Sequence, residues 1–121
     1  MEFISPTKGK LSFDEVFDEV LSYASRFPED NYRLIIGTDS QIREETCFVT
    51  ALIVHREGKG GRFFYTRKWE NHAHSLRQRI FYEASLSLNV ASMFTEKLAE
   101  SGQELNMEIH LDVGNNGATK T

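Results

Sequence analysis

The sequence predicts an α/β domain, in which helices cover a mixed β-sheet. Segments with apolar residues at helical spacing alternate with short runs rich in β-branched residues. A glycine-rich turn at residues 58–61 joins two of these runs into a hairpin. A long helix, from about Ser75 to Glu100, then leads to a last strand. A crossover of that length makes the last strand parallel to the first.

Residues 1–10 read as an irregular lead-in, and residues 12–27 predict an amphipathic helix. Ser12 followed by Glu15 is a capping-box pattern, which marks where a helix begins. Pro28 ends this helix, because proline cannot continue it. Its apolar residues share one face: Phe13, Val16, Phe17, Val20, Leu21 and Ala24. We expect this face to pack on the sheet or to mediate self-association.

Four strands are predicted, and the first three form an antiparallel meander at residues 32–40, 47–57 and 62–69. Residues 107–113 predict the fourth strand. Their strict alternation puts Glu108, His110 and Asp112 on one face. The element order is helix, three antiparallel strands, long helix and a fourth strand parallel to the first.

The composition is that of an ordinary globular chain of 121 residues, with 40% hydrophobic and 26% charged residues, and it predicts one domain. No apolar run approaches the roughly 20 residues that span a bilayer, so we expect no membrane partner. The chain has one cysteine, Cys47, so an internal disulfide is excluded. We expect Cys47 in the core and a reduced, cytoplasmic setting.

The net charge of −4 argues against a nucleic-acid partner, but the charges are unevenly distributed. Residues 43–79 hold eight basic and four acidic side chains, a local charge of +4. Such a block can contact phosphates, or it can be a solvated hairpin. Two aromatic residues within it, Tyr65 and Trp69, can stack on single-stranded bases. We favour the alternative, that both pack on the core or on the neighbouring strand.

Three acidic residues are predicted to meet at one edge of the sheet. Asp39 lies at the end of the first strand and Asp112 at the end of the fourth. Glu83 lies on the face of the long helix that should pack on the sheet. Three carboxylates that meet repel one another unless a proton or a cation neutralises them. Oxygen ligands select hard ions, so the sequence predicts one or two Mg²⁺ or Mn²⁺ ions.

Each acid also has a purely structural interpretation. Asp39 can cap a turn through Ser40 and Gln41, Glu83 can pair with Arg79, and Asp112 can form an Asx-turn.

Two further residues near the C-terminal end of the sequence, His110 and Lys120, are candidate site residues. His110 can orient Asp112 as a hydrogen-bond donor, or it can be a buried core histidine. The last segment, "GNNGATKT", lacks the spacing of a P-loop, because Thr119 rather than glycine precedes Lys120. Lys120 remains a candidate contact to phosphate.

Four motifs together resemble a family of small, poorly characterised bacterial proteins classed as ribonuclease-H-like. They are "IGTDSQ", "VHREGKGG", "RIFYEASL" and "HLDVGNNGATK", and the resemblance covers about residues 32–121. In that superfamily an aspartate of the first strand, a glutamate of the next helix and an aspartate ending the fourth strand bind two divalent metals. The resemblance therefore implies that Asp39, Glu83 and Asp112 are the catalytic metal ligands.

The resemblance also implies the domain organisation. Residues 31–121 would form the ribonuclease-H-like core, and residues 1–30, the lead-in and helix, would be an addition to it. The superfamily continues with a helix, a strand and a last helix that brings a fourth ligand. This sequence stops at Thr121, so we expect a truncated core with an open sheet edge.

The implied activity is divalent-metal-dependent hydrolysis of phosphodiester bonds in nucleic acid. Four further residues are expected to contact the substrate: Thr38, Ser40, Gln41 and Lys120. The alternative is a non-catalytic module that binds nucleic acid or a protein partner. A homo-oligomer that pairs through the open sheet edge is a third possibility.

Overall fold

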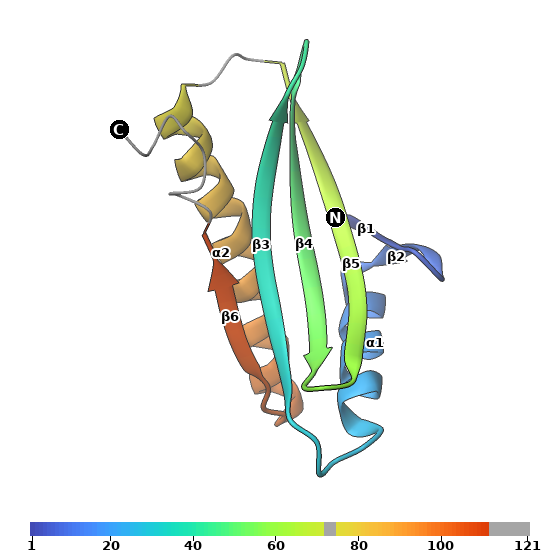
Figure 1. The fold of residues 1–121 in the computed structure, drawn as a ribbon. Coiled ribbons are helices and arrows are strands. Elements are labelled where there is room, and N and C mark those ends of the chain that lie inside the picture. Colours follow the sequence, from blue (N-terminus) through green and yellow to red (C-terminus); the bar gives the residue numbers. More distant parts are fainter. Residues whose placement is uncertain (72–74, 112–121) are drawn as a thin grey trace.

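A mixed β-sheet forms the centre of the computed structural model, which describes residues 1–71 and 75–111 (Figure 1). Within that part of the chain the sheet has six strands in the order β2-β1-β5-β4-β3-β6. The elements follow the chain as β1 (Glu2–Ser5), β2 (Gly9–Ser12), α1 (Phe13–Ser25), β3 (Tyr32–Ile42), β4 (Thr46–Arg56), β5 (Gly60–Glu70), α2 (Leu76–Ser101) and β6 (Asn106–His110).

The predicted fold class is confirmed by the strand pairing. β3, β4 and β5 form an antiparallel meander in which β3 and β4 pair along their whole lengths. β6 runs parallel to β3, and its last residue, His110, pairs with Gly37. The long helix α2 makes the crossover between β5 and β6, as its length required.

The N-terminal segment differs from the expected irregular lead-in. β1 and β2 form a short antiparallel hairpin, and β1 extends the sheet beyond β5 through the pair Ile4 and Tyr65. Ser5 Oγ accepts hydrogen bonds from the backbone amides of Thr7 and Lys8, which closes the turn. Strands of four residues offer too few positions for alternation to be recognised, and the contact with β5 is tertiary.

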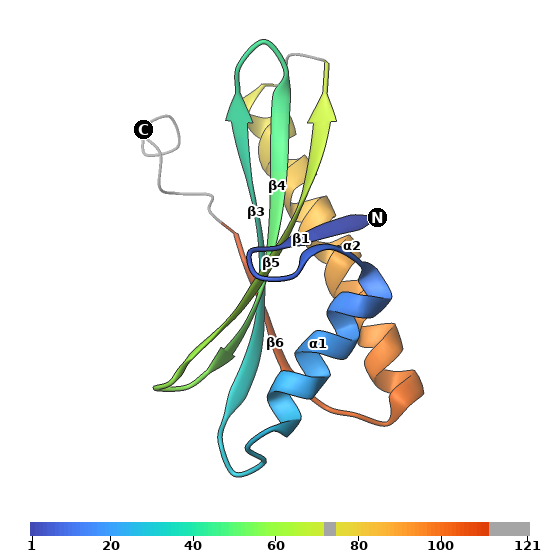
Figure 2. The ribbon, with the colours of Figure 1, turned by 90° about the vertical axis from the view of Figure 1, so that its right-hand side faces the viewer.

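Both helices lie on the same side of the sheet (Figure 2). α1 begins at the predicted capping box, because Ser12 Oγ accepts from the Glu15 amide and the Glu15 carboxylate accepts from the Ser12 amide. Its apolar face packs on the sheet and α2, which confirms the first of the two expectations for this helix. Phe13 stacks edge-on against Phe94 of α2, with ring centroids 5.8 Å apart.

Side chains alternate along the strands, so the sheet has two distinct faces. The helix face carries the buried side chains of β3 and β4, among them Leu34, Ile36, Leu52 and Val54. The open face is the other one, and on β3 and β4 it carries Arg33, Ile35, Gly37, Asp39, Gln41, Val49, Ala51 and Ile53. No helix among the described residues covers the open face (Figure 2).

The single cysteine and the hydrophobicity of the helices were also considered in the sequence. Cys47 is buried and is a free cysteine, as its apolar surroundings predicted. In the described ranges, no helix is both long enough and apolar enough to cross a lipid bilayer.

Candidate functional site

Asp39 lies on the open face of β3, where it pairs with Val49 of β4. Its side chain is exposed, and its Oδ1 atom accepts a hydrogen bond of 2.9 Å from the backbone amide of Ser40. Asp39 lies within β3 and not in a turn, so this bond to the next amide is not the turn cap through Ser40 and Gln41 that the structural interpretation anticipated. The bond uses one carboxylate oxygen and leaves the residue accessible to solvent.

Asp39 contributes to a cavity of about 410 Å³ on the open face. Gly37 and Ala51, which pair across β3 and β4, form part of its lining together with Gln41 and His110. A Cβ atom added to Gly37 would lie 3.3 Å from the carbonyl oxygen of His110, so glycine allows β6 to approach β3 closely. The cavity therefore combines an apolar floor with an acid, an amide and an imidazole.

His110 is held by a chain of charged groups on the open face. Its Nε2 atom lies 3.0 Å from Oε1 of Glu108, and Oε2 of Glu108 accepts a 2.8 Å bond from Arg33. The hydrogen bond from His110 and then the bond from Arg33 lower the pKa of the Glu108 carboxyl below its ordinary value. The His110 side chain is 59% exposed, so the interpretation of a buried core histidine is wrong.

Glu83 lies where the helical spacing predicted, on the side of α2 that faces the sheet. Its carboxylate accepts a short hydrogen bond from the Ser40 hydroxyl of β3. Arg79 donates to the same hydroxyl at 3.3 Å. Ser40 thus joins a basic and an acidic side chain of α2 to β3.

Asp39 and Glu83 lie on opposite sides of the sheet. Ser40 points toward α2 and Glu83, so its neighbour Asp39 points toward the open face. Within residues 1–71 and 75–111, no group of three or more His, Cys, Asp or Glu side chains is placed to hold a metal ion. The third predicted acid, Asp112, and the candidate phosphate contact Lys120 lie outside the described residues.

The candidate substrate residues divide between the two faces. The Thr38 hydroxyl is buried on the helix face, where it lies 3.0 Å from Thr50 Oγ1 and 2.7 Å from Ser87 Oγ. It therefore ties β3 to β4 and α2, although Thr38 is also among the residues that line the open-face cavity. Gln41 is exposed and lines that cavity with Asp39.

Sequence reasoning missed the buried hydroxyl cluster of Thr38, Thr50 and Ser87. Ser87 lies in the stripe of buried, mostly apolar residues of α2 that packs on the sheet. A serine within such a stripe indicates a polar partner on the opposing strand, because a buried hydroxyl is costly without one.

Tyr65 and Trp69 of β5 do not pack in the core, which was one of the two placements favoured for them, but each lies beside a residue of the neighbouring strand β4. Neither Tyr65 nor Trp69 belongs to the buried core, and Trp69 is 55% exposed. Phe63, two positions before Tyr65, is 41% exposed. These side chains alternate onto the open face, the face that carries Asp39.

Comparison with known proteins settles the family. A family model described as Ribonuclease H-like matches residues 15–121. The chain belongs to the ribonuclease H-like family. The match agrees with the order of strands and helices and confirms the resemblance noted in the sequence.

A relative from Bacillus subtilis (strain 168), named Uncharacterized protein YkuK, is 32% identical over 138 residues. That alignment covers 98% of this chain and 76% of the relative. No solved structure matches the chain significantly. Membership of the ribonuclease H-like family points to a role connected with nucleic acid, either as a nuclease or as a binding module.

Proposed function

We propose that the chain is a divalent-metal-dependent nuclease that hydrolyses phosphodiester bonds of nucleic acid. The observation that carries this proposal is the position of Asp39, exposed on the open face of β3 beside the end of the parallel strand β6. In sheets of this kind, ligand sites favour the carboxyl ends of parallel strands. Asp112 follows His110, the last residue of β6, by two positions.

The donor chemistry fits Mg²⁺ or Mn²⁺, because the proposed ligands are the carboxylates of Asp39, Glu83 and Asp112. Glu83 is one of the proposed ligands because its carboxylate accepts a hydrogen bond from Ser40, the residue next to Asp39. A bound ion would lower the pKa of a water and offset the charge that develops on the phosphate.

The other residues of the site have supporting roles in this proposal. The Ser40 hydroxyl donates to the Glu83 carboxylate and accepts from Arg79, and these two bonds hold the first turns of α2 at β3. Glu108 orients the His110 ring at the cavity that Asp39 lines. Gln41 and Lys120 are the proposed contacts to substrate. We place the activity in the cytoplasm, the setting that the single cysteine predicted.

The test is cleavage of a labelled RNA/DNA hybrid, single-stranded RNA and single-stranded DNA, with and without added Mn²⁺ or Mg²⁺. We expect cleavage that requires the ion and that falls roughly 100-fold or more in Asp39→Asn, because a metal ligand is lost. Asp18→Asn, an exposed acid on α1, is the matched control. Unchanged cleavage by Asp39→Asn would refute the assignment.

Metal binding separates the nuclease from a non-catalytic ribonuclease H-like module. Calorimetry should detect saturable Mn²⁺ binding that is lost in Glu83→Gln and kept in Glu96→Gln, an exposed position of the same helix. Absence of binding by the full chain would favour the module, which uses the same fold without chemistry.

We also propose that β6 can pair with a second copy of the chain. Among the described strands β6 is at one end of the sheet, and an edge strand has unpaired backbone groups on its outer side. Sedimentation at increasing protein concentration should reveal a dimer, and a monomer at every concentration would count against edge pairing.

A further inference from the structure

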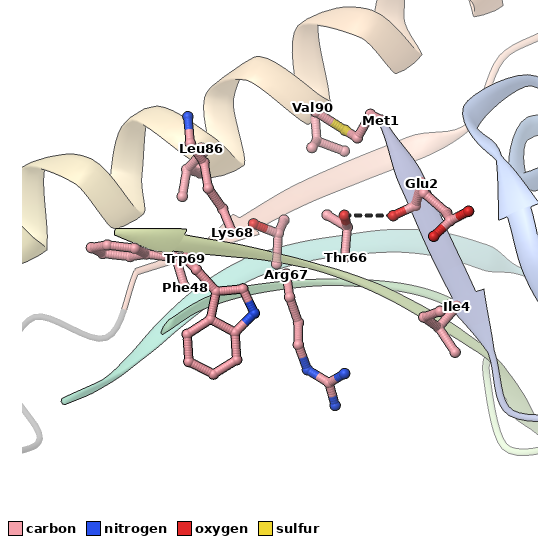
Figure 3. A pocket seen from close by; sticks show the side chains of 11 residues that line it. Met1, Glu2, Ile4, Phe48, Thr66, Arg67, Lys68, Trp69, Leu86 and Val90 are labelled. Atoms are coloured by element: carbon pink, nitrogen blue, oxygen red, sulfur yellow. Dashed lines mark hydrogen bonds between the residues drawn. The ribbon is translucent and has the colours of Figure 1, made fainter. Parts of the chain in front are cut away.

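The open face of β5 carries three aromatic side chains and one arginine in a single row. Phe63, Tyr65 and Trp69 alternate onto this face together with Arg67, which is also exposed. The Phe63 and Tyr65 rings lie 5.6 Å apart. Figure 3 shows Trp69 and Arg67 on the side of β5 that points away from α2, whereas Lys68 extends toward the helix. This row, residues 63, 65, 67 and 69, is called the β5 row below.

The β5 row has the chemistry of a surface that stacks on unpaired bases. Alternate residues of a strand are about 6.8 Å apart, so the row offers aromatic faces at regular intervals with a cation between them. Aromatic side chains on a positively charged surface bind single strands, because every base has a flat face. Bases of a duplex stack on one another and cannot offer those faces.

Arg67 is available to a phosphate. Its guanidinium lies over the Tyr65 ring, 5.0 Å from the centroid, and it makes no ion pair with any residue in the described ranges. The other cations of β5 are Arg62, which lies over the Tyr23 ring, and Lys68, which lies over the Tyr82 ring. Arg62 and Lys68 therefore extend to the helix side of the sheet, and Arg67 is the cation that the β5 row itself offers to a polyanion.

The β5 row is in register with the candidate catalytic acid. Arg67 pairs with Val49, and Val49 pairs with Asp39, so these three residues lie on one line across the sheet. Neighbouring strands are about 4.8 Å apart, which puts the backbones of Arg67 and Asp39 roughly 10 Å apart. The side chain between them is aliphatic. A chain of nucleotides can therefore follow a smooth path from the aromatic residues to Asp39.

We propose that the β5 row binds single-stranded nucleic acid by base stacking and directs the backbone toward Asp39. This inference rests on the proposed function for the choice of nucleic acid as the partner, and it names the single strand as the form that is bound. Arg67 contacts a phosphate, while Trp69 and the pair of Phe63 and Tyr65 stack on bases to either side of it.

Binding is measured without cleavage, on the Asp39→Asn background in EDTA. Trp69 is the only tryptophan in the chain, so its fluorescence reports directly on stacking. We expect a single-stranded oligouridylate or oligothymidylate to quench this fluorescence, and we expect a duplex of equal length not to.

Fluorescence anisotropy of a labelled strand then compares variants. Trp69→Ala should weaken binding of the single strand roughly 10-fold or more, since stacking on one aromatic residue is worth about 1–3 kcal/mol. Trp69→Phe should restore most of it. The matched control is Phe81→Ala, which removes a 71% exposed aromatic ring from α2, and it should bind like the parent.

The salt dependence of the affinity for the single strand tests the phosphate contact of Arg67. Arg67→Gln should reduce the slope of log affinity against log salt by about 0.7, the value for one phosphate contact to a single strand. Lys68→Gln, which removes a cation from the other face of the same strand, should leave the slope unchanged. Circular dichroism of each variant checks that the fold is kept.

The outcomes separate this inference from the nuclease proposal. Equal affinity of Trp69→Ala and its parent for the single strand would overturn the stacking surface, even if the protein cleaves nucleic acid. Equal affinity for single strand and duplex would also overturn it, as would binding to neither. Tight binding that depends on Trp69, in a protein without metal-dependent cleavage, would uphold the surface and refute the nuclease.

Discussion

Thr38 is the residue on which the contact between β3 and α2 depends most directly. Its buried hydroxyl lies within hydrogen-bond distance of Thr50 and Ser87, and all three side chains are nearly inaccessible to solvent. A buried hydroxyl that loses its hydrogen-bond partner destabilises the fold, because its desolvation is then not compensated. The cluster also sits one residue before Asp39, so it helps to fix the position of the candidate catalytic acid.

Thr38→Val keeps the shape of the side chain and removes the shared hydroxyl. We expect the free energy of unfolding to fall by about 1–3 kcal/mol, because Thr50 and Ser87 lose a partner. Urea denaturation measures the change. The double variant Thr38→Val with Ser87→Ala should lose less than the sum of the two single variants, since fewer hydroxyls remain unpaired. Strict additivity would indicate that the cluster does not act as a unit.

The ionisation of Glu108, on the open face, makes the stability of the fold depend on pH. His110 first and Arg33 second lower its pKa from the ordinary value of 4.5 in the folded protein. A group with a depressed folded pKa stabilises the fold above its unfolded pKa, and this contribution disappears as the pH falls through the folded value. The difference in unfolding free energy between the parent and Glu108→Gln should therefore be constant from pH 6 down to about pH 4.5 and shrink below it. A difference that grows on acidification would contradict the assigned direction.

At the scale of elements, the long periodic segments could be predicted from the sequence and the short ones could not. The helices α1 and α2 follow from apolar spacing and caps, and Glu83 was correctly placed on the inner face of its helix. The hairpin of β1 and β2 was missed because its strands are too short to show a period. The face on which Asp39 lies was also undetermined, because Leu34, Ile35 and Ile36 are all apolar and do not distinguish the two sides of the strand.

The capping box of α1 offers a test at this scale. Ser12→Ala removes the acceptor for the Glu15 amide, a bond of 3.1 Å, and should lower the free energy of unfolding by about 1 kcal/mol. Ser12→Asp should retain most of the stability, because aspartate also caps helices. Ser22→Ala, at an exposed position within the same helix, should stay within about 0.5 kcal/mol of the parent. Equal effects of the two alanine variants would show that the cap contributes nothing.

At the scale of the whole molecule, the N-terminal segment and the ribonuclease H-like core share one hydrophobic interior. Phe3 of β1 is fully buried, with its ring centroid 6.2 Å from that of Phe13 in α1. Phe13 in turn contacts Phe94 of α2. The Thr66 hydroxyl donates a 2.6 Å bond to the Glu2 carbonyl and fastens β1 to β5. These contacts argue that residues 1–30 stabilise the core and do not merely extend it.

Phe3→Ala tests whether the two segments unfold together. The loss of a buried ring should lower the free energy of unfolding by about 3–5 kcal/mol. If the interior is shared, Trp69 fluorescence, which reports on β5, and far-ultraviolet circular dichroism, which reports on the helices, should move to the same lower urea midpoint. Lys10→Ala, an exposed change in the same hairpin, should leave both midpoints in place. A Trp69 transition that stays at the parent midpoint in Phe3→Ala would mean that the N-terminal segment folds apart from the sheet, since the sheet would then not depend on the buried ring.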